Sequence, residues 1–161
     1  MSPSLPSGPA RPAESQDPPE LLYLVEHQVW ARLHGDGTAT VGISRLGARL
    51  AGEIYRCRPK PVGADVAQGR SMAVVELAKS IMSVKCPVSG TVVEINDALE
   101  DTPELVFRDP YGEGWIARLR LADLDADRAL LVTGEAVAPA MAHHAWLNRV
   151  DESDAGDAPG A

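Results

Sequence analysis

The sequence predicts a mainly β domain, either a small sandwich or a flattened barrel, with short flanking helices that include one near the C-terminus. Short runs rich in valine and isoleucine, which suit a half-buried pleated surface, alternate with glycine turns along the middle of the chain. A weak internal repeat points the same way, because Val62-Gly63 precedes one strand and Val88-Ser89-Gly90 precedes another. The repeat indicates a two-fold arrangement of strands.

The two ends of the chain differ from its middle in composition. Residues 1–20 are rich in proline, serine and alanine and have almost no apolar anchor. Such a segment cannot bury enough surface to offset its ordering entropy, so we expect it to be disordered. Residues 151–161 hold four acidic residues and no basic one, which predicts a second, acidic disordered tail. One folded domain is therefore expected over residues 21–150.

The folded domain is expected to open with a β-hairpin and a short helix. Residues 21–33 and 38–43 carry apolar side chains at alternating or near-alternating positions. The segment 34–37 between them, His-Gly-Asp-Gly, is a turn signal. Ser44 suits the N-cap of a helix over 44–50, because its hydroxyl can accept a hydrogen bond from a free amide of the first turn.

A lysine lies at the tip of the next predicted hairpin. A strand is expected at 54–57, and the stretch 74–84 is expected to form two strands joined by a tight turn that contains Lys79. A corner with a proline follows at 87–90. A lysine at such a tip carries its amine on a long flexible stem away from a rigid body. This placement suits an enzyme that must attach a prosthetic group to one particular lysine.

The C-terminal third combines strands, a loop and helices. Residues 91–95 are predicted as a strand and residues 96–105 as a loop. Residues 115–121 alternate apolar and basic side chains, which predicts an edge strand with one basic face. The segments 124–131 and 135–150 are predicted as helices.

The composition argues against several classes of protein. The net charge is −8 at pH 7, and an acidic chain offers nothing to phosphates, so nucleic acid is not an expected partner. No hydrophobic run approaches the roughly 18 residues of a membrane span. Prolines interrupt the N-terminus where a secretory signal needs an apolar core, and two cysteines do not suggest a disulfide framework. We expect a monomer in the bacterial cytoplasm, without a metal site or a catalytic triad.

A set of motifs from Val41 to Trp115, nearly half of the chain, resembles the glycine cleavage system H protein family. The most specific is the run at 109–115, Asp-Pro-Tyr-Gly-Glu-Gly-Trp. The other matching residues are Gly52-Glu53-Ile54, Val62-Gly63, Val66, Gly69, Val75-Glu76, Lys79, Pro87-Val88-Ser89-Gly90, Glu94, Asn96, Leu99 and Pro103-Glu104-Leu105-Val106.

The resemblance implies the barrel-sandwich hybrid fold and a carrier protein rather than an enzyme. Lys79 stands at the position that carries lipoate in this family, so lipoate would be attached to it through an amide bond. Glu76 matches a glutamate of the family, and we interpret it as a recognition contact for a lipoate ligase. The cofactor would then supply the chemistry, because its dithiolane exchanges with thiols.

Several residues depart from the family pattern. Members usually have His-Glu-Trp near the start, whereas residues 27–30 are His-Gln-Val-Trp. An acidic residue commonly follows shortly after the lipoyl lysine, but Met82 and Ser83 occupy this region, and Phe107 replaces an asparagine. The residues that build the fold are kept while those that would surround the cargo are changed, which is expected if the cargo itself has changed.

Cys57 and Cys86 are candidates for a redox or sulfur-handling role. Cys57 lies in a predicted strand between Arg56 and Arg58, and nearby cations lower the pKa of a thiol. Cys86 lies at the foot of the lysine hairpin. The alternative for both is a buried cysteine that packs as a small hydrophobic residue.

These departures favour a lipoate-binding protein of heterodisulfide-reductase-like sulfur oxidation, with sulfur intermediates as its cargo. The alternative is an ordinary glycine cleavage H protein, which passes methylamine from a decarboxylase to an aminomethyltransferase and then meets a lipoamide dehydrogenase. An unmodified interaction domain and a biotin carrier are two further alternatives. A biotinyl hairpin usually has methionines on both sides of the lysine, and Ala78 and Ser80 stand there instead.

Overall fold

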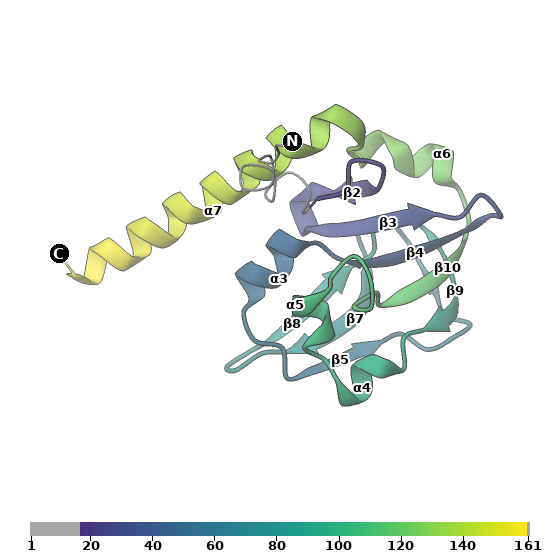
Figure 1. Cartoon of the computed structure of the whole chain (residues 1–161), viewed down its shortest axis with the longest axis horizontal. Coiled ribbons are helices and arrows are strands. Elements are labelled where there is room, and N and C mark those ends of the chain that lie inside the picture. Colours follow the sequence, from purple (N-terminus) through teal and green to yellow (C-terminus); the bar gives the residue numbers. More distant parts are fainter. Residues whose placement is uncertain (1–16, 161) are drawn as a thin grey trace, which may run out of the picture.

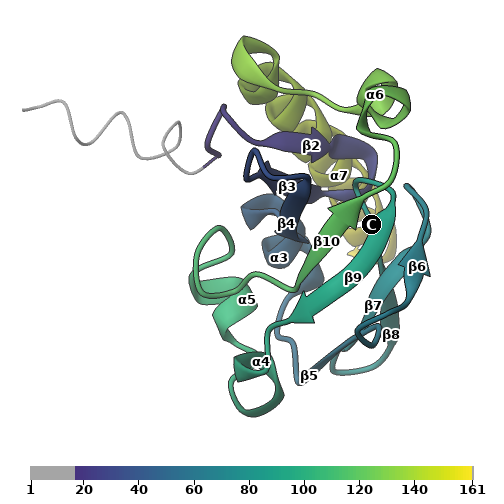
Figure 2. The same ribbon diagram turned by 90° about the vertical axis from the view of Figure 1, so that its right-hand side faces the viewer.

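The computed structural model describes residues 17–160, with side chains as far as Asn148. It shows a mainly β body of two antiparallel sheets and a long helix that projects from this body (Figures 1 and 2). The predicted mainly β class with a C-terminal helix is therefore confirmed. Most of the predicted N-terminal tail, at 1–16, lies outside the described residues.

Six strands form the larger sheet and three form the smaller one. The larger sheet contains, in spatial order, β2 (Leu22–Leu24), β3 (Val29–Leu33), β4 (Thr38–Ile43), β10 (Ala117–Leu121), β9 (Gly90–Ile95) and β6 (Asp65–Val66). The smaller sheet contains β5 (Arg56–Pro59), β7 (Ser71–Glu76) and β8 (Ile81–Lys85). In Figure 2 the larger sheet lies toward the viewer, and strands β7 and β8 of the smaller sheet lie behind it.

One hydrophobic core fills the space between the two sheets. The larger sheet contributes Val41, Val92 and Leu119, and the smaller sheet contributes Val75 and Val84, all of them buried. Successive strand residues point to opposite faces, so every second position reaches this core. Burial of one such side chain contributes about 1.5–3 kcal/mol, and the sum of these contributions holds the sheets together.

The predicted first hairpin and helix are confirmed, but the 3-10 turn η1 (Val25–His27) divides the segment 21–33 into β2 and β3. β3 and β4 pair in register across the turn at 34–37. Helix α3 (Arg45–Ala51) follows Ser44, whose hydroxyl oxygen accepts a hydrogen bond from the Gly47 amide at 3.0 Å. This bond satisfies one of the free amides of the first turn. Gly52 ends the helix with φ +84°, a backbone conformation that glycine adopts without strain.

Strand β10 is central in its sheet, not at an edge as predicted. It lies between β4 and β9, and Leu119 pairs with Ala39 on one side and Val92 on the other. Leu119 is buried, whereas the neighbouring Arg118 reaches Glu94 at 3.7 Å on the outer face. Alternation of side chains shows which face of a strand is buried. It does not show whether partner strands lie on both sides, because these come from distant parts of the chain.

Two further segments differ from the prediction. The expected loop at 96–105 contains one short helix and the start of another, and the expected helix at 124–131 is divided into two short turns. Helices of one turn gain little from intrinsic propensity, so tertiary contacts decide where they form. These elements are α4 (Ala98–Asp101), α5 (Leu105–Arg108), α6 (Leu124–Asp127) and the 3-10 turn η2 (Arg128–Leu130).

The chain is anchored before the predicted domain boundary at residue 21. The Pro18 carbonyl accepts a hydrogen bond from the Tyr23 hydroxyl at 2.7 Å. The Asp17 carboxylate accepts one from the Tyr111 hydroxyl at 2.6 Å. Both anchors are hydrogen bonds. The predicted boundary relied on apolar residues, so it lies a few residues after the first anchored one.

Helix α7 (Val137–Gly160) packs on the body through its first turns, after the short turn η3 (Gly134–Ala136). The second hydrophobic cluster has the buried members Leu21, Tyr23, Trp30, Val137 and Met141. The helix continues past residue 150, where the folded domain was predicted to end. Its side chains are described only to Asn148, so the separate acidic tail at 151–161 stays a prediction.

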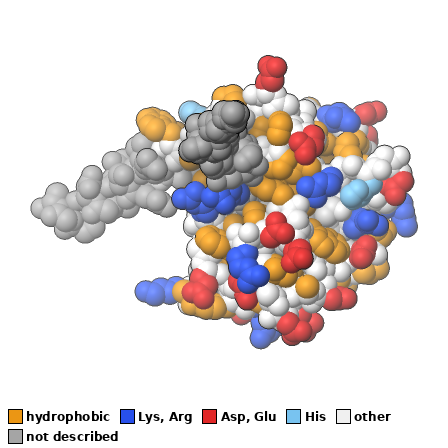
Figure 3. Space-filling view, viewed as in Figure 1, with side chains coloured by type: hydrophobic (Ala, Val, Ile, Leu, Met, Phe, Trp, Pro, Cys, Tyr) orange, Lys and Arg blue, Asp and Glu red, His pale blue; other side chains and the backbone are white. Residues whose placement is uncertain are grey.

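The surface of the body mixes charges of both signs. On the face shown in Figure 3, acidic and basic side chains are interspersed with hydrophobic ones rather than gathered into one charged field. Over the part of the chain that the structure describes, no helix combines the length and the apolar character needed to cross a bilayer.

Candidate functional site

Lys79 lies at the tip of the β7–β8 hairpin, as predicted. The two strands pair as far as Glu76 and Ile81, and beyond them the Leu77 amide donates a hydrogen bond to the Ser80 carbonyl at 2.8 Å. Lys79 and both of its sequence neighbours are exposed. The primary amine is therefore carried on a flexible stem outside a rigid pair of strands.

A partly buried polar cluster lies at the foot of the hairpin. Asp127 of α6 is buried, and its carboxylate accepts hydrogen bonds from the amide and the hydroxyl of Ser89 at 2.6 and 3.1 Å. The side-chain amide of Gln68 donates to the carbonyls of Pro87 and Asp127, both at 2.9 Å. The sequence analysis missed Asp127, because nothing in a short acidic helix signals that one carboxylate is buried.

Glu76 ends strand β7, three residues before Lys79. Its carboxylate lies 3.9 Å from the Arg58 guanidinium, and 40% of the Glu76 side chain is exposed. An exposed ion pair of this kind contributes little to stability. The carboxylate is thus accessible to another protein, and its role in recognition by a lipoate ligase stays a prediction.

A groove of about 350 Å³ lies beside the hairpin. Leu77 and Met82, which stand on either side of the lysine tip, form one wall. Gly47 and Leu50 of α3 form a second wall. The 3-10 turn η1 (Val25–His27) and helix α7 also contribute residues to the lining. Met82 is therefore placed where the sequence analysis expected it, whereas Phe107 is half-exposed on α5 and does not line this groove.

The altered His-Gln-Val-Trp segment contributes Gln28 to the groove. Gln28 is buried and has a left-handed backbone conformation with φ 55°. Its side-chain nitrogen donates to the Val25 carbonyl at 2.9 Å and to the Met141 sulfur at 3.4 Å. Its side-chain oxygen accepts a hydrogen bond from the Ser44 hydroxyl at 2.5 Å. Gln28 therefore ties together η1, the start of α3 and helix α7.

Helix α7 contributes His144 to the same groove. The imidazole is partly buried, and its pKa is lowered by that burial and, to a smaller extent, by His143. The sequence analysis assigned no role to this histidine. A signal for it was absent, because only the packing of α7 on the body brings position 144 to a hairpin about sixty residues earlier in the chain.

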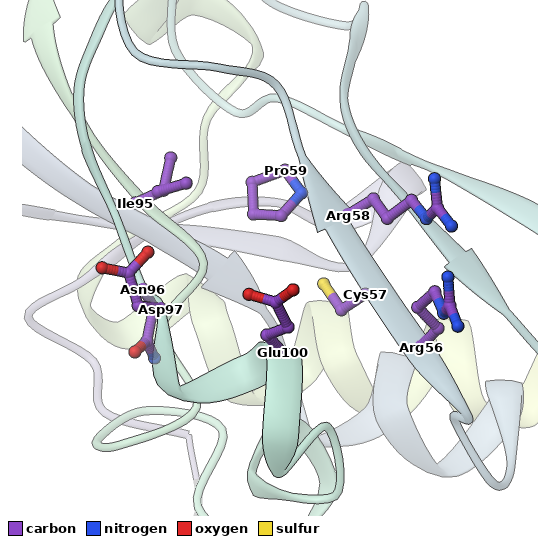
Figure 4. Close-up of a pocket in the computed structure, with 8 residues that line it drawn as sticks. All are labelled: Arg56, Cys57, Arg58, Pro59, Ile95, Asn96, Asp97 and Glu100. Carbon is purple, nitrogen blue, oxygen red and sulfur yellow. The ribbon is translucent and has the colours of Figure 1, made fainter.

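Cys57 is buried on the inner face of β5, in the main core. Its sulfur points toward Glu100 of α4, whereas Arg56 and Arg58 point away on the other side of the strand (Figure 4). Burial raises the pKa of the Cys57 thiol to about 12. Alternation along the strand places both arginines on the opposite face from the thiol, so they do not lower this pKa. The groove of about 520 Å³ beside Cys57 is a different one from the groove beside the β7–β8 hairpin.

Cys86 is fully buried at the foot of the hairpin. Its thiol donates a hydrogen bond to the Val88 carbonyl at 3.0 Å. Burial is the main cause that raises its pKa to about 12. Neither Cys86 nor Cys57 lines the groove beside the β7–β8 hairpin. A sulfur-handling role for either stays a prediction.

Neither thiol of the folded protein is expected to react with iodoacetamide at pH 8. A pKa of about 12 leaves on the order of one thiol in ten thousand as the reactive thiolate, and burial blocks access as well. Both thiols should react in guanidinium chloride, as followed by intact mass. Since the folded state binds these protons more tightly than the unfolded chain does, raising the pH from about 9 toward 12 should lower the free energy of unfolding. Rapid labelling of Cys57 in the folded protein would contradict this.

The Asp-Pro-Tyr-Gly-Glu-Gly-Trp run supports the fold rather than the lysine hairpin. The Tyr111 hydroxyl oxygen accepts a hydrogen bond from the Arg45 amide at 3.1 Å, and the ring packs edge-on against Tyr23 with the centroids 6.3 Å apart. Gly114 approaches the backbone of Leu105 so closely that a Cβ atom has no room. The run therefore joins α3, α5 and the N-terminal strand.

Comparisons with known proteins all point to one family. A family model described as glycine cleavage H-protein matches residues 21–144. The glycine cleavage system H protein 2 of Aquifex aeolicus is 46% identical over 118 residues, which cover 73% of each chain. The glycine cleavage system H protein of Pseudoalteromonas atlantica is 43% identical over 117 residues, which cover 73% of this chain and 90% of the relative. A crystal structure of a glycine cleavage system H protein from Mycobacterium marinum has a TM-score of 0.63 and 26% identity, and the match covers 81% of this chain and 98% of that chain.

Proposed function

This chain belongs to the glycine cleavage H-protein family, and from this premise we propose that it carries lipoate on Lys79 and acts as a lipoyl carrier in glycine cleavage. The main support is the placement of Lys79, an exposed lysine at the tip of a rigid two-stranded hairpin. Lipoate on Lys79 would supply a disulfide that takes up a carried group on one sulfur as the S–S bond is reduced, and after release of the group the dithiol would return to the disulfide by exchange with a partner. The protein itself holds and presents this group and performs no catalysis.

The residues around the tip fit such a group. The only other lysines, Lys60 and Lys85, lie outside the turn between the two strands of this hairpin, so neither offers an amine in the same place. Asp127 and Ser89 hold the foot of the hairpin, which gives a modifying enzyme a fixed target. Glu76 is the contact that we assign to the lipoate ligase, because it is accessible and close to the lysine in sequence.

The comparisons favour the glycine-cleaving alternative over the sulfur cargo that the sequence analysis preferred. The relatives are named as glycine cleavage system H proteins. Cys57, which was one reason for the sulfur cargo, is buried, as is Cys86, and burial raises the pKa of each thiol. We therefore propose a lipoate ligase, the glycine-cleaving decarboxylase and aminomethyltransferase, and lipoamide dehydrogenase as partners. A heterodisulfide-reductase-like complex gains no support.

Reconstitution tests this proposal. The full chain is lipoylated with a ligase and then mixed with a bacterial glycine decarboxylase, aminomethyltransferase and lipoamide dehydrogenase. We expect formation of NADH that depends on glycine and on the lipoylated chain, with none from the unmodified chain. A lipoylated chain that fails with glycine but is turned over with a sulfane-sulfur donor and a heterodisulfide-reductase-like complex would overturn the glycine-cleaving function and restore the sulfur cargo.

A further inference from the structure

A second groove lies on the outer face of the larger sheet. It has a volume of about 250 Å³ and shares no lining residue with the groove beside the β7–β8 hairpin. Four neighbouring strands and the run at 109–115 contribute to it. The lining residues are Arg32, Thr40, Glu94, Gly112, Trp115 and Arg118. A concave site is therefore assembled from parts of the chain that are far apart in sequence.

Strand register brings four polar side chains of this groove into one row. Thr40 of β4 pairs with Arg32 of β3 on one side and with Arg118 of β10 on the other. Arg118 in turn pairs with Glu94 of β9. Residues directly opposite each other on neighbouring strands point to the same face, and each strand lies about 4.8 Å from the next. Two long arginine side chains thus flank one threonine hydroxyl, close enough to converge on a small group above it.

Neighbouring rings hold two of these groups in place. The Arg32 guanidinium carbon lies over the ring of buried Trp30, 5.1 Å from its centroid. This cation–π contact fixes the side chain without supplying an oxygen acceptor for its N–H donors. His34 Nε2 lies 2.7 Å from the Thr40 hydroxyl oxygen. When the ring donates this hydrogen bond, the hydroxyl keeps its own proton for a ligand. Little ordering of these side chains is left to occur on binding.

The row has a positive charge that no acidic side chain neutralises in the part of the chain that the structure describes. The Arg118 guanidinium lies 3.7 Å from the Glu94 carboxylate. None of the salt bridges among the described residues involves Arg32. Two arginines and one glutamate line the groove, so it is cationic although the chain as a whole has a net charge of −8. The planar fork of a guanidinium matches two oxygens of a carboxylate or a phosphate.

We propose that this groove is an oxyanion site that binds one carboxylate or phosphate group, with Arg32 as its main contact and with Thr40 and Arg118 as further donors. A volume of about 250 Å³ is below that of sites for drug-sized ligands, which suits a single acidic group. The group belongs either to a free small anion or to an acidic side chain of a partner protein. The site is separate from Lys79, so this inference does not depend on the proposed lipoylation.

Titration of the full-length, unmodified chain by NMR provides the test. Backbone amide shifts are followed with inorganic phosphate, and in a second series with a short glutamate-containing peptide, at an ionic strength held constant with sodium chloride. We expect saturable shifts of the Thr40 and Arg118 amides with a dissociation constant of about 1 mM, in line with a few charge-assisted hydrogen bonds at a partly exposed site.

Substitutions of the two arginines should weaken this binding to different extents. Arg32→Gln should raise the dissociation constant about tenfold, because the unpaired charge and the fork are both lost. Arg32→Lys should raise it about threefold, since lysine keeps the charge without the fork. Arg118→Gln leaves the contact between Arg32 and Trp30 in place and should also cost about threefold, which keeps the test valid if Arg32→Gln unfolds.

Arg120→Gln is the matched control. Arg120 follows Arg118 by two residues on β10 and is exposed, but it does not line the groove. Its loss removes the same charge from the same face and should change the dissociation constant by about twofold or less.

The two probes distinguish the sources of the acidic group. Saturation with phosphate supports a free anion, and saturation with the peptide alone supports an acidic side chain of a partner. Shifts that neither probe produces beyond those of sodium chloride would overturn the inference. An effect of Arg120→Gln as large as that of Arg32→Gln would overturn it too, because the binding would then reflect only the charge of the face. Neither result would affect the proposed function, since lipoylation is read separately from intact mass.

Discussion

Replacing Lys79 by arginine is expected to abolish lipoylation and carrier activity while leaving the fold intact. Arginine keeps the positive charge, but its guanidinium is not a nucleophilic amine and cannot form the amide bond. Lys79 is exposed at the hairpin tip, where a surface substitution changes the free energy of unfolding by only about 0.5 kcal/mol or less. Intact mass after incubation with a lipoate ligase should show no added group, and the circular dichroism melting curve should match that of the wild type.

Lys60→Arg and Lys85→Arg are the matched controls for this experiment. These are the only other lysines of the chain, and both lie outside the turn of the hairpin. Each variant should accept one lipoyl group at the wild-type rate. Modification that persists in Lys79→Arg, or that disappears in Lys85→Arg, would place the attachment site elsewhere and refute the proposal.

Replacing Trp30 by alanine is expected to lower the free energy of unfolding by about 3–5 kcal/mol, the usual cost of a large-to-small change at a fully buried aromatic. Trp30 is fully buried, and its indole N–H donates to the carbonyls of Ile43 and Pro110 at 3.0 and 3.1 Å. The ring also packs against Gly42, where a Cβ atom would lie only 2.7 Å from it. Alanine would leave a cavity and two carbonyls without their donor.

Trp30→Phe separates the two contributions, because it keeps an aromatic ring and removes only the N–H donor. We expect Trp30→Phe to lower the free energy of unfolding by less than Trp30→Ala does. Trp146→Ala, on an exposed turn of α7 with 59% of the residue accessible, should change the free energy of unfolding by about 0.5 kcal/mol or less. Denaturant titration measures all three. A small effect of Trp30→Ala would mean that the second hydrophobic cluster does not hold α7 on the body.

Features formed by residues close in sequence were predictable from the sequence. The placement of Lys79 at a hairpin tip was predicted because the hairpin is local: the strands, the tight turn and the lysine all lie within fifteen residues. The cap at Ser44 was predicted for the same reason, since its hydroxyl bonds an amide three residues away. A pattern of adjacent residues is sufficient wherever the interacting groups are close in sequence.

Burial and strand partners were not predictable in this way. The sequence left open whether Cys57 is a reactive thiol or packs as a buried residue, and only the structure shows that the thiol lies in the core. The basic face of β10 suggested an edge strand, yet strands from two distant segments enclose it. In each case the outcome depends on which remote element covers a face, and alternation along one strand contains no information about that element.

The sequence by itself determined the mainly β class and the hairpin with Lys79 at its tip, because these follow from short-range pattern and turn chemistry. The proposed attachment of lipoate to Lys79 rests on the family resemblance instead. Only the tertiary structure decided that Asp127 holds the foot of the hairpin, that Gln28 links three elements, and that His144 faces the groove beside Lys79. Asp127 and His144 lie about fifty and sixty-five residues from the lysine. Residues so far apart come together only when the burial of apolar surface, which is non-directional, brings their elements together around a common core.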